Sequence, residues 1–372
     1  MSKIKLLFRI GYAYHKAAFD PVIEWLMHDD KYDIWFSLDM EKKRYFFLFD
    51  IPYQAPIIEK WQQLGYRFTK EKTGFDIVIT GDTLRDAAAY GKVLLCFLNH
   101  GTGIKNILYR ELARVPNDKY QIFVEGPHRL RSLTHSPALG KNAAHVIGLP
   151  KLDFYFQGRF NNHKEILQRW GLDPNKKTIM YAPTYKPTSL YQVKDDIFQQ
   201  TKNFNLIIKL HPYSWMGKYA PHRQHRIYER RVKEYPHAVL LPFDEYNIVP
   251  YLSVADVVMS EASSTIFDFV ALGKYGIIYD LPCDQLVHSD GQPLLETDNR
   301  EFLQGAFVHI NSGKQIREAI EQCLNPTPEM ISAAHTYRND LFYMLDGKAT
   351  ERFVNKMEGL YYEGGHENIP SK

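Results

Sequence analysis

Short apolar runs alternate with amphipathic segments along most of the chain. Runs bounded by glycine, proline or polar residues are typical of buried strands, and apolar positions at helical spacing indicate covering helices. In the first half we expect helices at Ala17–Met27 and Pro56–Leu64. The strands predicted there are Ile4–Arg9, Tyr32–Leu38, Phe75–Thr80, Val93–Leu98, Gln121–Val124 and His145–Ile147.

A second series of the same kind follows residue 165. Its predicted strands are Thr178–Tyr181, Leu206–Leu210, Ala238–Leu240, Val257–Met259, Gly276–Tyr279 and Ala306–Ile310. Its predicted helices are Lys164–Trp170, Lys314–Leu324, Pro328–Leu345 and Thr350–Met357. The pattern predicts an α/β fold with two Rossmann-like domains, residues 1–165 and 166–345, whose parallel sheets face each other across a cleft. Residues 346–372 hold a last helix and a polar tail.

One strand-to-helix turn has the chemistry of a phosphate site. A strand over Ala255–Met259 leads through Ser263 and Ser264 into an apolar helix over Ile266–Leu272. Two hydroxyls there would lie among unpaired backbone N–H groups at the positive end of the helix dipole. The alternative is that Ser263 is an ordinary helix cap, and the local sequence leaves both interpretations open.

Polar residues follow other predicted strands as well. In open parallel sheets ligands bind outside the carboxyl ends of the strands, so these residues are candidates for one site. The candidates after the other strands are His100, Gly101, Thr102, Thr184, Lys186 and His211. His100 could take a proton from an attacking hydroxyl, since an imidazole titrates near neutrality. Asp268, one helical turn beyond Ser264, could accept hydrogen bonds from a ribose, or equally form an ordinary helix ion pair.

Composition narrows the function classes. The 372 residues include only three scattered cysteines (Cys96, Cys283, Cys323) and carry a formal net charge of +3. This indicates a reducing, cytoplasmic environment without a disulfide framework, and does not indicate a nucleic-acid partner. No stretch reaches the roughly 20 apolar residues of a membrane span. Phosphate-binding P-loop and dinucleotide-binding glycine motifs are absent, and no metal-ligand cluster stands out, so we expect neither a cofactor nor a metal.

Two basic segments leave a surface question open. They lie around His128–Arg131 and His222–Lys233. A solvated helix face is favoured slightly over peripheral contact with an anionic polymer or with the anionic inner face of the cell membrane.

Six ordered motifs resemble those of the CDP-glycerol glycerophosphotransferases, the teichoic-acid primases and polymerases. The motifs are Asn99–Lys105, Gly148–Asp153, Tyr181–Lys186, Lys209–Pro212, Ala255–Lys274 and Met344–Val354. The resemblance implies the two-domain GT-B fold, with a last helix that returns to the first domain. It covers the chain from about Asn99 to Val354 and is weaker before that.

The resemblance also implies roles. His100 would be the general base, and His211 would contact the donor phosphates and stabilise charge on the leaving CMP. Ser263, Ser264 and Lys186 would bind the diphosphate, with Glu261 beside them on the substrate. This sequence departs from the family at Gly103-Ile104 (Pro-Leu), Lys186 (Arg) and Glu261-Ala262 (Asp-Tyr).

The function expected from these features is transfer of a polyol phosphate, foremost glycerol phosphate, from a CDP-activated donor. The acceptor would be a hydroxyl of a lipid-linked molecule or a saccharide, in teichoic-acid or capsule synthesis. Two alternatives remain from the sequence. One is a GT-B glycosyltransferase or UDP-sugar 2-epimerase, and the other is a nucleotide-binding scaffold without activity.

Overall fold

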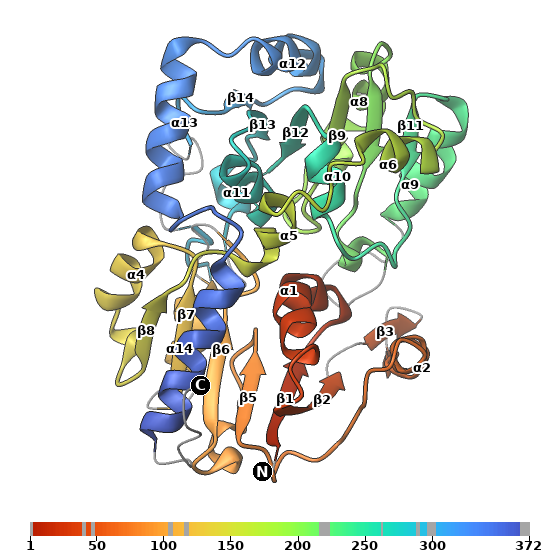
Figure 1. Cartoon of the computed structure of the whole chain (residues 1–372). Helices are drawn as coiled ribbons and strands as arrows, with labels where there is room; N and C mark the ends of the chain where they lie inside the picture. The colour runs from red at the N-terminus through yellow and green to blue at the C-terminus, as the bar shows by residue number, and fades with distance from the viewer. Residues whose placement is uncertain are drawn as a thin grey trace.

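Two parallel six-stranded sheets form the centres of two domains (Figure 1). The computed structural model describes residues 3–38, 42–45, 49–102, 107–114, 119–215, 224–261, 263–287, 291–295 and 303–364. The first sheet has the order β2-β1-β5-β6-β7-β8 and the second β11-β10-β9-β12-β13-β14. A separate antiparallel ribbon pairs β3 with β4.

The strands of the first domain are β1 (Ile4–Ile10), β2 (Tyr32–Leu38), β3 (Lys42–Tyr45), β4 (Phe49–Pro52), β5 (Ile77–Thr80), β6 (Leu94–Leu98), β7 (Tyr120–Val124) and β8 (Ala143–Val146). Those of the second are β9 (Thr178–Tyr181), β10 (Asn205–Ile208), β11 (Ala238–Leu240), β12 (Val257–Ser260), β13 (Gly276–Tyr279) and β14 (Val308–Ile310).

The helices up to residue 200 are α1 (Lys16–Met27), α2 (Ala55–Gln62), α3 (Ile107–Ala113), α4 (Pro127–Thr134), α5 (Asp153–Phe156), α6 (His163–Arg169), α7 (Leu190–Val193) and α8 (Asp196–Gln200). The later ones are α9 (His225–Arg231), α10 (Val249–Val254), α11 (Ser264–Ala271), α12 (Ile316–Leu324), α13 (Pro328–Leu341) and α14 (Ala349–Glu363). Within the described residues, every helix is too short or too polar to cross a bilayer.

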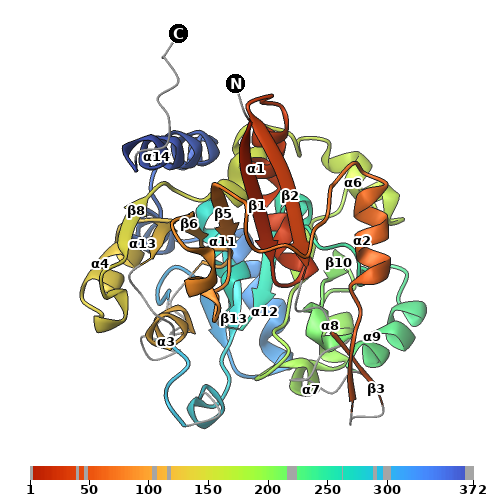
Figure 2. The ribbon, with the colours of Figure 1, turned by 90° about the horizontal axis from the view of Figure 1, so that it is seen from below.

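The first sheet is buried on both faces. Along β1, Leu6 and Phe8 pack into one core and Leu7 into the other, as the two-residue period of a strand requires. Helices α1 and α14 cover the first face and α3 covers the second, and Figure 2 shows α14 and α3 on opposite sides of the central strands. Burial on both faces explains why these strands appear in the sequence as continuous apolar runs.

The last helix packs against the first domain. Phe353 of α14 is fully buried, and its ring meets Phe123 of β7 edge-on at 4.7 Å between centroids. Figure 1 shows α13 beside the second domain and α14 running down along the first. The chain therefore crosses between the domains more than once. Leu149 and Leu152, ahead of the predicted boundary at residue 165, already pack in the second core.

The predicted α/β architecture is confirmed, with differences in detail. The β3–β4 ribbon was not predicted. Helix α13 ends at Leu341, short of the predicted Leu345, because Phe342 is extended and Met344 has a positive φ of 44°. The predicted polar tail lies outside the described residues from 365 onward.

The start of α14 is fixed by Asp153, which ends the Gly148–Asp153 motif. Its buried carboxylate accepts the backbone N–H groups of Ala349 (3.1 Å) and Thr350 (2.7 Å), which lie in the first turn of the helix. Since the first N–H groups of a helix have no partner within the helix, this contact caps α14 from almost two hundred residues away in sequence.

Replacing this cap should loosen α14 from the first domain. We expect Asp153→Ala to lower the free energy of unfolding by about 2 kcal/mol, because two buried N–H groups lose their acceptor. Asp153→Asn, which keeps one acceptor oxygen, should cost less. Urea denaturation measures both, with the exposed Asp30→Ala as control, expected within about 0.5 kcal/mol of the parent. Equal stability of Asp153→Ala and Asp30→Ala would contradict the capping role.

Candidate active site

Three neighbouring strands of the first sheet each deliver a titratable side chain at their carboxyl ends. His15 follows β1, Asp82 follows β5 and His100 follows β6, and these strands lie side by side in the order β1-β5-β6. The three side chains offer nitrogen or carboxylate oxygen atoms within 4.8 Å of one another. The sheet topology therefore gathers them at one edge, facing the second domain.

His100 is held in a defined tautomer. Its Nδ1 lies 2.7 Å from the carbonyl oxygen of Gly81, an acceptor, so Nδ1 carries the proton and Nε2 is the basic atom. A side chain at Gly81 would not fit, because its Cβ would lie 2.6 Å from the Phe19 ring and 3.1 Å from His100 Nδ1. Burial, and then the charge of His15, lower the pKa of His100 to about 4, although Asp82 acts in the opposite direction. The ring is thus neutral at pH 7 and able to accept a proton.

The rings of His15 and His100 are stacked, with centroids 3.7 Å apart and planes 25° from parallel. His15 Nδ1 lies 3.1 Å from the Asp82 carboxylate. Burial alone would raise the pKa of Asp82, but the charges and hydrogen bonds of its neighbours, His15 foremost, lower it to about 2. The spacing would suit a cation, yet nearly parallel stacked rings cannot direct both nitrogen lone pairs at one ion. This arrangement favours an electrostatic pair over a metal centre.

The second sheet repeats the arrangement with different chemistry. His211 follows β10, Thr184 follows β9, and Ser263 and Ser264 follow β12, which are again adjacent strands in the order β10-β9-β12. His211 Nδ1 accepts the backbone N–H of Tyr213 at 3.1 Å, so the neutral ring carries its proton on Nε2 and can donate there. The parallel sheet places this donor at the same sheet edge as the start of α11, with β9 between their strands.

The start of α11 differs from an ordinary capped helix. Ser263 occupies the N-cap position in extended conformation, but its hydroxyl caps no N–H group of the helix. It instead lies 2.8 Å from the Ser260 hydroxyl. The interpretation of Ser263 as an ordinary cap is therefore wrong, and the positive end of the helix dipole remains a suitable place for phosphate oxygens.

Glu261 shapes the loop that carries Thr184 and Lys186. Its carboxylate is buried and accepts from the backbone N–H groups of Thr184 (2.6 Å) and Ser189 (2.5 Å). Burial raises the pKa of this carboxyl, although these hydrogen bonds act against the rise. Lys186 stands exposed on the same loop. The geometry favours a supporting role for Glu261 over the predicted contact with substrate.

Asp268 joins the two domains. Its carboxylate is only 1% exposed and is paired with Lys151, from the Gly148–Asp153 motif. The Thr102 hydroxyl lies 3.2 Å from the Asp268 carboxylate and 3.2 Å from the Ser264 carbonyl oxygen, two acceptors that share its one hydrogen. Both carboxylate oxygens already bind protein groups, and the ribose contact stays a prediction. Thr102 and Asp268 instead place the segment of His100 against the start of α11.

Gly101 leaves room beside these groups. A Cβ built on it would meet nothing within 4 Å, and its backbone is hydrogen-bonded to the Asn99 side chain. The Asn99 amide in turn donates to Glu125 at 3.3 Å. The segment that carries His100 is therefore fixed on its far side as well.

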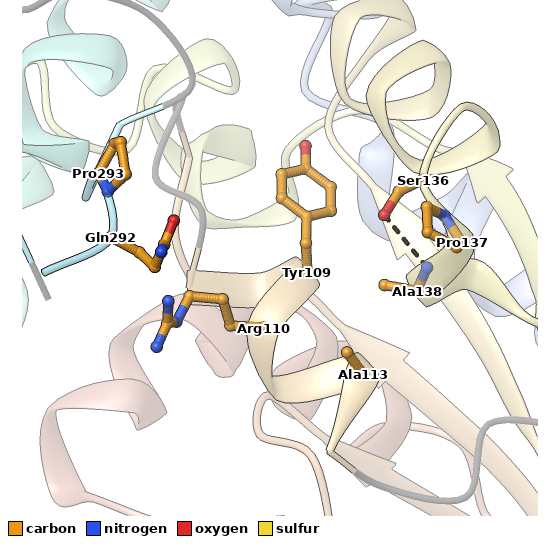
Figure 3. Close-up of a pocket in the computed structure, with 8 residues that line it drawn as sticks. All are labelled: Tyr109, Arg110, Ala113, Ser136, Pro137, Ala138, Gln292 and Pro293. Carbon is orange, nitrogen blue, oxygen red and sulfur yellow. Dashed lines mark hydrogen bonds between the residues drawn. The ribbon is translucent and has the colours of Figure 1, made fainter. Parts of the chain in front are cut away.

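A cavity of about 470 Å³ lies beside helix α3 (Figure 3). Tyr109 and Arg110 of α3 form one wall, and Gln292 of the second domain lies on another side. The Tyr109 hydroxyl accepts from Arg129 at 2.7 Å, and Arg129 pairs with Glu125, so buried contacts connect the cavity wall to Asn99. Arg129 is 3% exposed, which contradicts a solvated face for that member of the first basic segment. Aromatic, guanidinium and amide groups of this kind suit a polar ligand with hydroxyl groups.

His15 and Asp82 were not among the residues predicted from the sequence. The signal was available, because Asp82 comes two residues after a predicted strand, and that rule had found His100. His15 follows its strand by five residues, inside a turn of 3₁₀ helix (Ala13–His15). Only the pairing of β1 with β5, and β5 with β6, shows that these ends meet.

The chain is similar in sequence to one protein family and to individual known proteins. The family model described as CDP-Glycerol:Poly(glycerophosphate) glycerophosphotransferase matches residues 104–359, well over half of the chain. A teichoic acid glycerol-phosphate transferase of Staphylococcus aureus is 24% identical over 227 residues, 59% of this chain and 57% of that protein. A teichoic acid glycerol-phosphate primase of Bacillus spizizenii is 28% identical over 141 residues, 36% of this chain and 32% of that protein. The match thus spans 57% of the length of the first relative and 32% of the length of the second.

Solved structures are similar across nearly the whole chain. The wall teichoic acid polymerase TagF matches with a TM-score of 0.69 and 12% identity, over 98% of this chain and 90% of that one. The UDP-GlcNAc 2-epimerase of Neisseria meningitidis matches with a TM-score of 0.62 and 15% identity, over 96% and 100%. At this identity the likeness shows the fold, a GT-B-like pair of domains.

The interdomain pair can be tested by a double-mutant cycle. Lys151→Met leaves the buried Asp268 carboxylate without its cation and should cost about 3–5 kcal/mol of unfolding free energy. The double variant Lys151→Met/Asp268→Asn removes the uncompensated charge and should recover part of that loss. Urea denaturation of the parent, both single variants and the double variant gives the coupling. A loss in the double variant equal to the sum of the two single losses would show that the pair is not coupled.

Proposed function

Because the chain belongs to the CDP-glycerol:poly(glycerophosphate) glycerophosphotransferase family, we propose that it transfers glycerol phosphate from CDP-glycerol to an acceptor hydroxyl and releases CMP. The acceptor is a lipid-linked molecule or a saccharide in cell-surface polymer synthesis. The names of the two curated relatives support this proposal. Within the structure, its main support is that the segment of His100, a neutral imidazole, contacts the start of α11, where a helix dipole can bind an anion.

The donor is proposed to bind to the second domain. Its diphosphate lies at the start of α11, near Ser263 and Ser264, where the helix dipole and hydroxyl groups stabilise negative charge. His211 donates from Nε2 to a phosphate oxygen, and Lys186 supplies a further cation from its exposed loop. The scheme uses no cofactor or metal, since the protein itself supplies the positive groups.

The transfer step follows from the tautomer of His100. Nε2 takes the proton of the acceptor hydroxyl while that oxygen forms a bond to the β-phosphorus. The bond between the β-phosphorus and the bridging oxygen breaks, and CMP leaves with the electron pair. The charge that develops on CMP is stabilised by His211 and the start of α11, groups already oriented in the folded protein.

The first prediction for this scheme concerns the products. We expect CMP to be released from CDP-glycerol in the presence of acceptor, and no UDP to be released from a UDP-sugar. His100→Asn should lower kcat by about a hundredfold or more, yet leave the donor Kd near that of the parent, because His100 belongs to the acceptor side. Incubation with CDP-glycerol, CDP-ribitol, UDP-sugars and CMP-sugars, followed by nucleotide chromatography, measures this.

The outcomes separate the alternatives. UDP release would indicate a glycosyltransferase. Conversion of a UDP-sugar to its C2 epimer, with the UDP retained, would indicate an epimerase, the chemistry named for one structural neighbour. Nucleotide binding without any release would indicate a scaffold. Loss of donor binding in His100→Asn would show that His100 is a donor ligand.

We also propose that the protein works in the cytoplasm, peripherally at an anionic membrane, where a lipid-linked acceptor would lie. Helix α9 supports this, because Arg226 and Arg230 are exposed on it. Each basic residue near an anionic surface contributes about 1 kcal/mol, an attraction that salt screens.

Vesicle binding tests the membrane proposal. The parent should cosediment with vesicles that contain phosphatidylglycerol at low salt and dissociate at high salt. Arg226→Glu/Arg230→Glu should reduce the bound fraction at least about tenfold, whereas Lys314→Glu, an exposed charge on another element, should have little effect. Equal binding of the parent to neutral vesicles would contradict an electrostatic contact.

A further inference from the structure

We propose that His15 and Asp82 are positioning residues for His100: together they hold its ring, and His15 keeps the Nε2 of His100 unprotonated until the acceptor hydroxyl is bound. This inference rests on the proposed function, since it assigns His100 the role of base. It adds a residue pair that lies outside the family-model match at residues 104–359.

Contacts on two sides fix the His100 ring. Its edge is held by the Gly81 carbonyl at 2.7 Å, and the His15 ring covers one of its faces at 3.7 Å. His15 is itself only 3% exposed, and its Nδ1 is held by Asp82 at 3.1 Å. Stacking leaves no in-plane contact between the two rings, so His15 does not pass a proton to His100. It acts through its position and its charge.

The charges around His100 come from several elements. His15 on the turn after β1 and Lys151 beyond β8 disfavour an imidazolium, whereas Asp82 after β5 favours it. A protonated His15 forms an ion pair with the Asp82 carboxylate. Because His15 offsets the negative charge of Asp82, the carboxylate stabilises a protonated His100 less strongly. The neutral state of His100 thus depends on His15 as well as on burial. A bound diphosphate would add negative charge and make the imidazolium more favourable when it is needed.

The turn that carries His15 also contacts the donor side. The neighbouring Tyr14 ring meets the His15 ring edge-on at 4.4 Å and the His211 ring at 5.3 Å between centroids. One short segment after β1 therefore contacts or supports both proposed catalytic histidines. Movement of this segment would disturb acceptor and donor sides together.

Two substitutions at His15 separate charge from support. His15→Phe keeps an aromatic ring for the stack, and His15→Gln keeps a hydrogen-bond donor toward Asp82, but neither carries a positive charge. In both, the acid limb of the kcat/KM profile should move upward by about one pH unit, because His100 loses a repelling charge and faces Asp82 alone. His15→Gln should also lower kcat about tenfold to a hundredfold, because the His100 ring loses the aromatic ring that stacks on it.

His28→Phe is the matched control. It makes the same chemical change at the other end of helix α1, on an exposed side chain, and should leave the pH profile unchanged. The donor titrates in the same way with the parent and with every variant. Differences between their pH profiles therefore arise from groups of the protein. Unchanged acid limbs in both folded His15 variants would overturn the proposal and leave His15 a packing role only.

A measurement without substrate keeps this inference separate from the proposed function. Imidazole nitrogen and carbon chemical shifts, followed by NMR against pH, report the tautomer and titration of His100 directly. We expect Nδ1 protonation in the parent and an upward shift of the titration in His15→Phe. If the parent releases no CMP, the proposed function fails, while this titration still supports or overturns the electrostatic coupling of the three residues.

Discussion

A buried carboxylate that finds its partners in the other domain is the constraint on which the site depends. Asp268 lies in the apolar helix α11, where an unpaired charge would be strongly unfavourable. Thr102 of the first domain supplies the hydroxyl, and Lys151, in the segment where the chain passes into the second domain, supplies the cation. Satisfying that charge brings the segment of His100 against the start of α11. A group for proton transfer and an anion site are thereby positioned by one network.

The parallel topology explains why side chains from different strand ends lie close together in the site. Every strand in each sheet points the same way, so each carboxyl end opens onto the same edge. His15, Asp82 and His100 follow adjacent strands of one sheet, and His211 and Ser263 follow nearby strands of the other. Other residues of the sequence motifs make contacts within the protein instead. Asp153 caps a distant helix and Glu261 holds a loop, so a motif residue need not touch substrate.

The sequence predicted most strands and longer helices, because burial on both faces leaves apolar runs that are visible without any partner. It also predicted which strand ends carry polar chemistry. It failed for the β3–β4 ribbon, where pairing gives no apolar pattern of that kind. It also gave no sign of the contacts that the Glu261 and Asp268 carboxylates make within the protein. No local pattern distinguishes an acid that binds a ligand from one that binds its own protein.

The sequence by itself determined the fold class, the order of the elements and the chemistry available at each strand end, because these depend on local periodicity and on residue type. The tertiary structure alone decided which ends meet. The stacking of His15 on His100, the anchoring by Asp82 and the pairing of Asp268 with Lys151 join residues that are remote in sequence. Such contacts follow from strand order and domain packing, and these are set by the burial of whole faces, not by any single segment.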